Sequence, residues 1–341
     1  MTVRSGLGKW GLVLGAILLF WGVGCETPSY APSSAPSSAP SSARSTITSA
    51  TDASAPSPDD TPNYAAPPYY RVSGRGGATL YLLGTVHLGP PDGWDFAPRI
   101  DQDLAEADAF IMELDLRSLD NEAVGNAMAA RVILPAGTEL GDVTSPETQK
   151  LIEENDALIT SLGMPPLARK FRKPWYLAIS LLQVAIARTP YELEASAENQ
   201  IVALIGDRPL SGLETFDAQL GLFDSLSMPL QDLLLRDSLG RLDETAAEME
   251  RLVNAWKASD RASLHEISRQ GIDEYPDLEA FYDVLLRDRN RSWVVPLRER
   301  LDHAGLANTR IFVAVGALHL VGNDGVPALL EAAGYDVERL Y

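Results

Sequence analysis

The sequence predicts one α/β domain in which strands from both ends of the domain form a central sheet around a large helical insert. Buried-strand patterns occur within residues 69–114 and again within 309–341, whereas residues 145–303 are mainly helical in pattern. The stretches GTVHLGPPDG (84–93) and GALHLVGNDG (316–325) also repeat one Gly-x-x-His turn, each directly after an expected strand. Terminal strands hide their apolar faces by pairing with each other, so a single sheet is expected.

The N-terminal 25 residues are predicted to direct export. Two basic residues precede an apolar run from about Trp10 to Val23, which is typical of a secretory signal and too short for a spanning helix. Cys25, the only cysteine, follows small residues in GVGCE and resembles the lipidated cysteine of a bacterial lipobox. We therefore predict that residues 1–25 are a lipoprotein signal. The alternative is ordinary secretion, or an uncleaved anchor, with an incidental cysteine.

Residues 26–68 are predicted to be a disordered linker. The unit APSS recurs, and Pro, Ser and Ala leave almost no large apolar side chains from which a core could form. Such a segment would tether the globular domain, predicted over residues 69–341, away from a membrane surface.

Composition restricts the chemistry of the globular domain. The domain contains no cysteine, so disulfides and thiol catalysis are excluded. The net charge of −19 argues against nucleic-acid partners and against direct adhesion to anionic lipid. The acidity is otherwise typical of a solvated surface and indicates no particular substrate.

The first strands come from the beginning of the domain. Residues 69–72 and 78–83 are expected to form two short strands around the turn SGRGG, and the second strand leads directly into the first Gly-x-x-His turn. A helix then precedes an apolar run, 109–114, which is expected to be a strand buried on both faces. Glu113 lies near the end of this run, in a segment otherwise suited to a dry core.

Helices fill the middle of the domain, and further strands close it. The apolar segment that begins at Pro174 is expected to be a core helix rather than a membrane span. The expected elements are, in order, helices over 144–163 and 174–188, a short strand over 208–214, helices through 276–304, a buried strand over 309–319, a helix over 326–334 and a last strand over 335–341.

The two Gly-x-x-His turns are the clearest functional signal. In α/β sheets, sites form beyond the carboxyl ends of strands, where glycine permits a sharp turn and His87 and His319 can point back over the sheet. Glu113, at a third strand end, can add a carboxylate, and two histidines with one carboxylate are a standard ligand set for a divalent transition metal. The same groups could act as metal-free acid–base residues, or each histidine could simply cap its turn. Asp92 and Asp324 recur at equivalent positions and are expected to orient the turns or merely to form them.

Five motifs, in order along the chain, resemble the TraB/GumN family, which includes the Tiki proteases of animals. They are YLLGTVHLG, MELD, SGLETFDAQL, LLRDRNRSWV and IFVAVGALHLVGNDGV, and the resemblance covers about residues 69–341. It implies a fold similar to that of the erythromycin-esterase/ChaN-like group and a metal-dependent hydrolase. Tiki members use Mn or Co, and Zn or Fe would also suit the ligands. The residues that the resemblance makes essential are Gly84, His87, Glu113, Gly316 and His319.

Three further residues are secondary candidates. Arg289 and Asn290 in RDRN match another motif of the family, and an arginine on a helix facing the site could hold a substrate carboxylate or an oxyanion. It could equally form a structural ion pair with a nearby acid. Glu214 in GLET follows an expected strand and could either join the site or cap the next helix. Many bacterial members carry Gly-Leu-Asp where this chain has YELE, ending at Glu194, so no role is predicted for that glutamate.

Other catalytic motifs are missing from the sequence. LHEIS at Leu264–Ser268 begins like a zincin helix, but Arg269 occupies the position of the second histidine. No Gly-x-Ser-x-Gly elbow, phosphate loop or dinucleotide fingerprint occurs at a strand-to-helix junction. Neither His265 nor His303 is expected to be catalytic.

The leading hypothesis is an extracytoplasmic, lipid-anchored hydrolase that uses a divalent metal and acts on peptides or proteins. His87, Glu113 and His319 would hold the metal, Glu113 could instead be the general base, and Arg289 would assist catalysis. Peptide bonds are chosen by resemblance, since esters or other amides would need the same groups. The alternative is a non-catalytic module that sequesters a peptide signal or a metal. A structural envelope protein is a third possibility, but it leaves the repeated turn unexplained.

Overall fold

The computed structural model describes residues 64–273 and 275–341. The predicted export signal, the predicted lipidation site at Cys25 and the predicted linker up to residue 63 lie outside the described residues. Packing begins ahead of the predicted domain boundary at Tyr69, because Ala65 is 1% exposed and forms a β-bridge with Phe96. Within the described part of the chain, no helix is long and apolar enough to cross a membrane.

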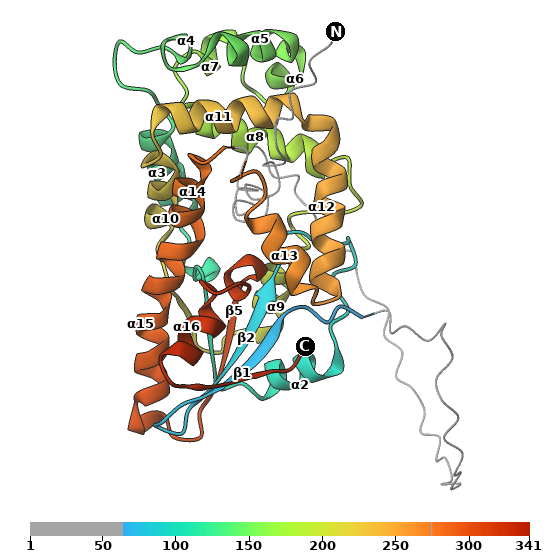
Figure 1. The fold of residues 1–341 in the computed structure, drawn as a ribbon, viewed down its shortest axis with the longest axis vertical. Coiled ribbons are helices and arrows are strands. Elements are labelled where there is room, and N and C mark those ends of the chain that lie inside the picture. Colours follow the sequence, from blue (N-terminus) through green and yellow to red (C-terminus); the bar gives the residue numbers. More distant parts are fainter. Residues whose placement is uncertain (1–63, 274) are drawn as a thin grey trace, which may run out of the picture. The chain divides into compact units, whose positions relative to one another are not determined.

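A six-stranded sheet combines strands from the two ends of the described chain (Figure 1). The strand order is β4-β3-β5-β2-β1-β6; the first four strands are parallel, whereas β1 is antiparallel to both of its neighbours. This arrangement confirms the predicted α/β class, with N- and C-terminal strands in one sheet. The strands are β1 (Tyr69–Ser73), β2 (Thr79–Thr85), β3 (Ala109–Met112), β4 (Leu210–Gly212), β5 (Arg310–Gly316) and β6 (Asp336–Arg339).

Strands β2 and β5 are direct neighbours at the centre of the sheet. Their parallel register runs from Thr79 opposite Arg310 to Thr85 opposite Gly316, and all but the first residue of each strand is buried. A central parallel strand is covered on both faces, which is why its sequence is almost continuously apolar. The pairing places the two Gly-x-x-His turns side by side at the carboxyl edge of the sheet.

Helices follow the strands and make up most of the middle of the chain. Pro174 occupies the first turn of α8, where its missing N–H costs no hydrogen bond, and the helix is largely buried, as predicted. The helices are α2 (Pro98–Glu106), η2 (Leu116–Ser118), α3 (Asn121–Arg131), α4 (Leu140–Val143), α5 (Pro146–Glu154), α6 (Asp156–Ser161), α7 (Pro166–Arg169), α8 (Pro174–Ile186), α9 (Ala197–Ile205), α10 (Phe216–Asp224), α11 (Met228–Gly240), α12 (Leu242–Lys257), α13 (Arg261–Ser268), α14 (Leu278–Tyr282), η3 (Asp283–Arg287), α15 (Asp288–Asp302), η4 (Ala304–Leu306), η5 (Ala317–Leu320) and α16 (Val326–Ala332).

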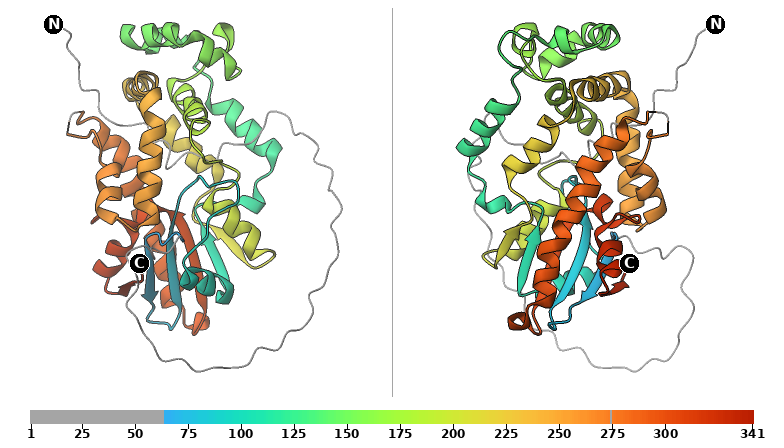
Figure 2. Two further views of the ribbon diagram at one scale, coloured as in Figure 1. Left: turned by 90° about the vertical axis from the view of Figure 1, so that its right-hand side faces the viewer. Right: turned by 60° about the vertical axis from the view of Figure 1, so that its left-hand side comes forward.

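Each face of the sheet packs against its own helices. On one face, Phe110 and Phe312 belong to a core shared with α9, α12 and α13. On the other face, Ile111 and Val313 pack with α15 and α16, and Figure 2 shows α15 running alongside the strands. Neighbouring residues of one strand therefore serve different cores, as the two-residue period of a strand requires. A third core joins α5, α6, α8 and α11.

Three predicted elements end differently from the expectation. Strand β3 stops at Met112, so Glu113 follows the strand instead of lying inside it. Strand β5 stops at Gly316, and His319 lies on the 3₁₀ turn η5. The helical segment expected over 276–304 is interrupted by η3, which is π-helical. Such single π turns are frequent at functional sites, and this one ends at Arg287, the first residue of the RDRN motif.

Candidate functional site

Four ionisable side chains follow the carboxyl ends of the four parallel strands. In the spatial order of the strands, Glu214 follows β4 and Glu113 follows β3, and then His319 follows β5 and His87 follows β2. The Glu214 N–H donates to the Glu113 carbonyl over 2.9 Å, which continues the β3–β4 pairing beyond both strands. One edge of the sheet thus gathers groups that lie far apart in the sequence.

The second Gly-x-x-His turn is tied to Glu113. The Gly316 N–H donates to Glu113 Oε1 over 2.7 Å, and the turn brings His319 Nε2 to 3.8 Å from the same oxygen. His319 Nδ1 lies 2.5 Å from Asn290 Oδ1, while the Asn290 amide group donates to the Asp324 carbonyl over 2.8 Å. Because an amide oxygen can only accept, these contacts assign the ring proton of His319 to Nδ1.

Arg289, in the first turn of α15, lies between these groups. Its Nη2 donates to Glu113 Oε2 over 2.6 Å, and its Nη1 lies 3.1 Å from His319 Nε2. Its Nε and Nη2 each donate to Glu214 over 3.0 Å, and Nη1 also donates to the Leu285 carbonyl in η3. Every guanidinium nitrogen therefore has a protein acceptor, and the residue is 3% exposed. Of the two predicted roles, the structure adopts the ion pair with nearby acids.

Glu214 belongs to this cluster rather than to a helix cap. Trp293 Nε1 donates to Glu214 Oε1 over 2.8 Å, in addition to the three bonds from Arg289. The neighbouring Thr215 is the residue that caps α10, through its side-chain oxygen. Glu214 thus fixes the position of Arg289, and through it the position of Glu113.

Burial and charge give two members of the cluster unusual pKa values. Burial alone would raise the pKa of Glu113, but the Arg289 cation, two histidines and a backbone hydrogen bond outweigh it and lower the pKa to about 2. Burial lowers the pKa of His319, the Arg289 cation lowers it further, and it reaches about 3 despite the nearby carboxylate. At neutral pH, Glu113 is ionised and His319 is a neutral imidazole.

The first Gly-x-x-His turn contains a different pair. His87 Nδ1 lies 3.0 Å from Glu198 Oε1, and the two side chains are 3% and 4% exposed. Burial alone would lower the pKa of His87, but Glu198, with a smaller contribution from Glu113, raises it above the ordinary value. The pKa values of the two histidines of the repeated motif are therefore shifted in opposite directions, although their turns are adjacent.

Glu198 was not singled out by the sequence patterns. It lies in the first turn of α9 behind the N-cap Ser196, where the helix dipole alone favours an acid. A signal did exist, because Glu198, Ile201 and Ile205 share the spacing of one buried helix face, and a charge on such a face is unusual. Glu194, one turn earlier, is exposed.

Comparison with known proteins places the chain in a family. The model of the TraB/PrgY/gumN family matches residues 68–339. The chain belongs to this family. The uncharacterised protein YbaP of Escherichia coli (strain K12) and its namesake in Shigella flexneri are each 24% identical over 273 residues, which cover 79% of this chain and 94% of theirs. An uncharacterised protein of Treponema pallidum (strain Nichols) is 24% identical over 208 residues, 59% of this chain and 60% of its own. No solved structure matches the chain.

In this TraB/PrgY/gumN chain, two glycines of the repeated motif allow close packing. A Cβ on Gly84 would lie 3.0 Å from the Ala317 Cα of the second turn, and Trp256 Nε1 donates to the Gly84 carbonyl over 2.7 Å. Gly322 has a φ of +74°, and a Cβ there would lie 2.4 Å from the ring of His265. Both the dihedral angle and the available space therefore favour glycine at Gly322.

The remaining candidates lie outside the cluster. Asp324 accepts a hydrogen bond from Arg287 over 3.1 Å and so anchors the second turn, whereas Asp92, at the equivalent position, is exposed. His265 packs against the second turn, and His303 Nδ1 accepts from a backbone N–H after α15. Neither of these two histidines contacts Glu113 or Arg289 in the described structure.

The positions of His87, Glu113 and His319 can be compared with those that the predicted metal would require. A divalent ion would need His87, Glu113 and His319 to direct lone pairs at one point, about 2 Å from each. Instead, the His319 Nε2 lone pair faces Arg289, and Glu113 accepts from both Arg289 and Gly316, so a fixed cation occupies the space between them. Within residues 64–273 and 275–341, no three His, Cys, Asp or Glu side chains are arranged to hold an ion. In this arrangement the residues do not fit a divalent metal.

Proposed function

We propose that this chain is an extracytoplasmic hydrolase that cleaves peptide bonds in peptides or proteins. The observation that carries the proposal is the buried His87–Glu198 pair at a strand end, beside a second histidine held by Glu113 and Arg289. Family membership and the predicted N-terminal signal support the reaction class and the compartment. An ester or another amide would require the same groups, so both are included in the test.

His87 is the proton-transfer group in this proposal. Hydrolysis needs a residue that takes a proton from water and returns it to the leaving group. Glu198 lies at Nδ1, as the acid does in the histidine–acid pair of a catalytic triad, and we assign proton exchange to the other ring nitrogen, Nε2. The raised pKa favours the imidazolium that forms when the ring takes a proton from the attacking water, and the imidazolium then returns that proton to the leaving group.

The cluster around the second histidine acts as a positioning unit. Arg289 spends all its donors on Glu113, Glu214, His319 and a carbonyl, so none remains for an oxyanion in this arrangement. His319 is held by Arg289 on one side and Asn290 on the other. These contacts fix the edge of the sheet next to His87, and we assign them that role.

Hydrolysis by the full-length chain in a non-ionic detergent tests the proposal. The substrates are a library of quenched fluorogenic peptides and p-nitrophenyl acetate. We expect His87→Gln to lower kcat by about 10²- to 10⁴-fold, the usual contribution of an acid–base residue. Glu194→Gln, which removes an exposed carboxylate from the segment just before α9, is the matched control and should leave the rate unchanged. Peptide binding without cleavage by the wild-type chain would instead favour the sequestering module.

Metal content is the second test. Because Arg289 occupies the space between Glu113 and His319, we expect less than one equivalent of Mn, Co, Zn or Fe in the purified chain, and activity that survives treatment with EDTA. The contrary result is stoichiometric metal in the wild type that is lost in a folded His87→Ala/His319→Ala variant. That outcome would reinstate the metal-dependent reaction expected from the family resemblance.

A further inference from the structure

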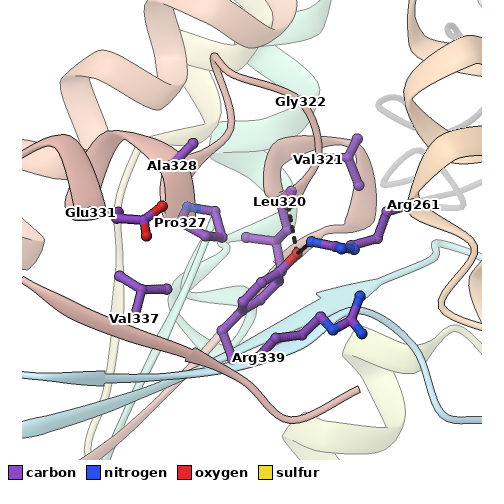
Figure 3. A pocket seen from close by; sticks show the side chains of 10 residues that line it. Arg261, Leu320, Val321, Gly322, Pro327, Ala328, Glu331, Val337 and Arg339 are labelled. Atoms are coloured by element: carbon purple, nitrogen blue, oxygen red, sulfur yellow. Dashed lines mark hydrogen bonds between the residues drawn. The ribbon is translucent and has the colours of Figure 1, made fainter.

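A cavity of about 210 Å³ lies beside the second Gly-x-x-His turn. Its walls come from the edge of the sheet, from η5 and the turn after it, and from α13 and α16 (Figure 3). Leu320, Val321 and Gly322, which directly follow His319, form one wall, and Pro327, Ala328 and Val337 add apolar surface. A ligand in this cavity would therefore contact the backbone of the turn that carries His319.

Two exposed arginines line the same side of the cavity. Arg339 in β6 pairs across the sheet with Tyr70, and Arg261 begins α13; Figure 3 shows both guanidinium groups near the turn end of the cavity. Arg261 Nη1 donates to the Tyr70 hydroxyl over 3.4 Å, and that hydroxyl donates to the Leu320 carbonyl over 3.2 Å. Within the described residues, no carboxylate forms an ion pair with either arginine. The adjacent Arg71, by contrast, pairs with Glu338.

The charge and shape of the lining select a class of ligand. The charged residues of the lining are two arginines and Glu331, which Figure 3 shows away from the arginines, across the cavity. The lining thus has a net charge of one positive unit in a chain whose total charge is −19. A single negative charge matches this balance, whereas Glu331 disfavours a dianion. An arginine guanidinium binds a planar carboxylate with two parallel hydrogen bonds, and the apolar walls suit a small aliphatic group.

We infer that this cavity binds a carboxylate carried by a small aliphatic group, with Arg261 and Arg339 as its anion-binding residues. The two sources of that chemistry are the C-terminal carboxylate of a peptide and a free short-chain carboxylic acid. Arg261 donates to the Tyr70 hydroxyl, and that hydroxyl donates to the Leu320 carbonyl. One hydroxyl group therefore links the site to the second turn.

Binding is measured by isothermal titration calorimetry on the full-length chain carrying His87→Gln, which removes the proposed proton-transfer group. The probes are N-acetyl-Ala-Ala-Ala with a free carboxylate, the same peptide with a C-terminal amide, sodium acetate and inorganic phosphate. We expect the free-carboxylate peptide to bind at least about tenfold more tightly than its amide. Tighter binding of the peptide than of acetate identifies a peptide C-terminus as the source, and equal binding identifies a free acid; either result supports the site.

Variants assign the binding to the arginines. Arg261→Gln/Arg339→Gln should weaken binding of the peptide acid at least about tenfold, whereas Glu331→Gln, which removes the repulsive charge, should strengthen it about two- to threefold. Arg298→Gln/Arg300→Gln removes the same charge from exposed positions of α15 and serves as the control. The inference is overturned if the amide binds as tightly as the acid, if phosphate binds more tightly than either carboxylate, or if the Arg261/Arg339 variant binds normally. These outcomes do not depend on whether the chain is a hydrolase.

Discussion

The two Gly-x-x-His turns are nearly the same in sequence but differ in chemistry. In the first turn, His87 faces a carboxylate, and its pKa is raised by Glu198 against the effect of burial. In the second turn, His319 faces a cation, and its pKa is lowered to about 3 by burial and by Arg289. Both histidines are almost fully buried, so burial does not explain the difference. The sign of the nearest charge decides the direction in which the pKa of each ring is shifted.

The different neighbours come from different helices. Helix α9 brings Glu198 to the first turn, whereas α15, directly after the π-helical segment, brings Arg289 and Asn290 to the second. A repeated turn on adjacent strands thus has two chemical environments, set by the helices packed on it. Environments that push the pKa values of two titratable groups apart are the usual origin of an acid–base pair.

The largest effect is expected from removing the cation of the second turn. Arg289→Met leaves Glu113 and Glu214 buried without a positive partner, and breaking a buried ion pair in this way costs about 3–5 kcal/mol. Urea unfolding measures the loss. The matched control is Arg291→Met in the same helix, whose ion pair is exposed and worth less than about 1 kcal/mol. Equal destabilisation by the two variants would show that Arg289 does not organise the cluster.

Acid should destabilise the chain through the second turn. His319 has a folded pKa of about 3 against an ordinary 6.5, so the unfolded chain binds its proton first and stability falls as the pH drops from about 6.5 to 3. Glu113, with a folded pKa of about 2 against 4.5, adds a loss below about pH 4.5. His87 has the opposite sign: its raised pKa stabilises the fold at low pH, and that stability is lost as the pH rises through the folded pKa.

His319→Gln should reduce the acid-dependent slope of unfolding free energy between pH 6.5 and 4.5 by up to about 1.4 kcal/mol per pH unit, the effect of one proton. His303→Gln alters an exposed histidine and should keep the wild-type slope. If both variants show the wild-type slope, the ring of His319 is not held neutral in the fold.

Glu198→Gln should lower the pKa of His87 toward that of His319. Without the carboxylate, burial lowers the pKa of His87 below its ordinary value, so the ring is neutral at pH 7. NMR titration of the imidazole protons measures the shift, and the limb of the pH–rate profile that reports His87 should move to lower pH in the variant. Glu194→Gln is again the control. A pKa of His87 that stays raised in Glu198→Gln would assign the shift to another group.

The smallest effect is expected at the repeated aspartates. Asp324→Asn weakens the ion pair with Arg287, which keeps Glu279 and Asp283 as partners, so the cost in unfolding free energy is expected to be below about 1 kcal/mol. Asp92→Asn alters an exposed side chain and should have no measurable effect. Thermal melts of the two variants compare the turns, and a larger loss for Asp92→Asn would contradict the structural difference described between them.

The sequence by itself determined the strands and their order along the chain. Apolar runs such as IFVAV predict buried parallel strands, because a strand covered on both faces must be apolar along its whole length. The need to hide such strands then predicts that β2 and β5 share a sheet. The positions of His87, Glu113 and His319 at strand ends follow from the same patterns, since glycine and strand endings are local features.

Only the tertiary structure decided which charges meet. Glu198 resembles an ordinary acid of a helix N-terminus, and Arg289 lies in a helix whose register is altered by the π turn of η3. The burial of Glu198 and Arg289, and the distance from each to a histidine, cannot be read from sequence spacing. Glu198 lies more than 100 positions from His87, and Arg289 lies 30 positions from His319. A pKa depends on charges that are close in space, so the chemistry of the repeated turn was fixed by packing and not by the motif.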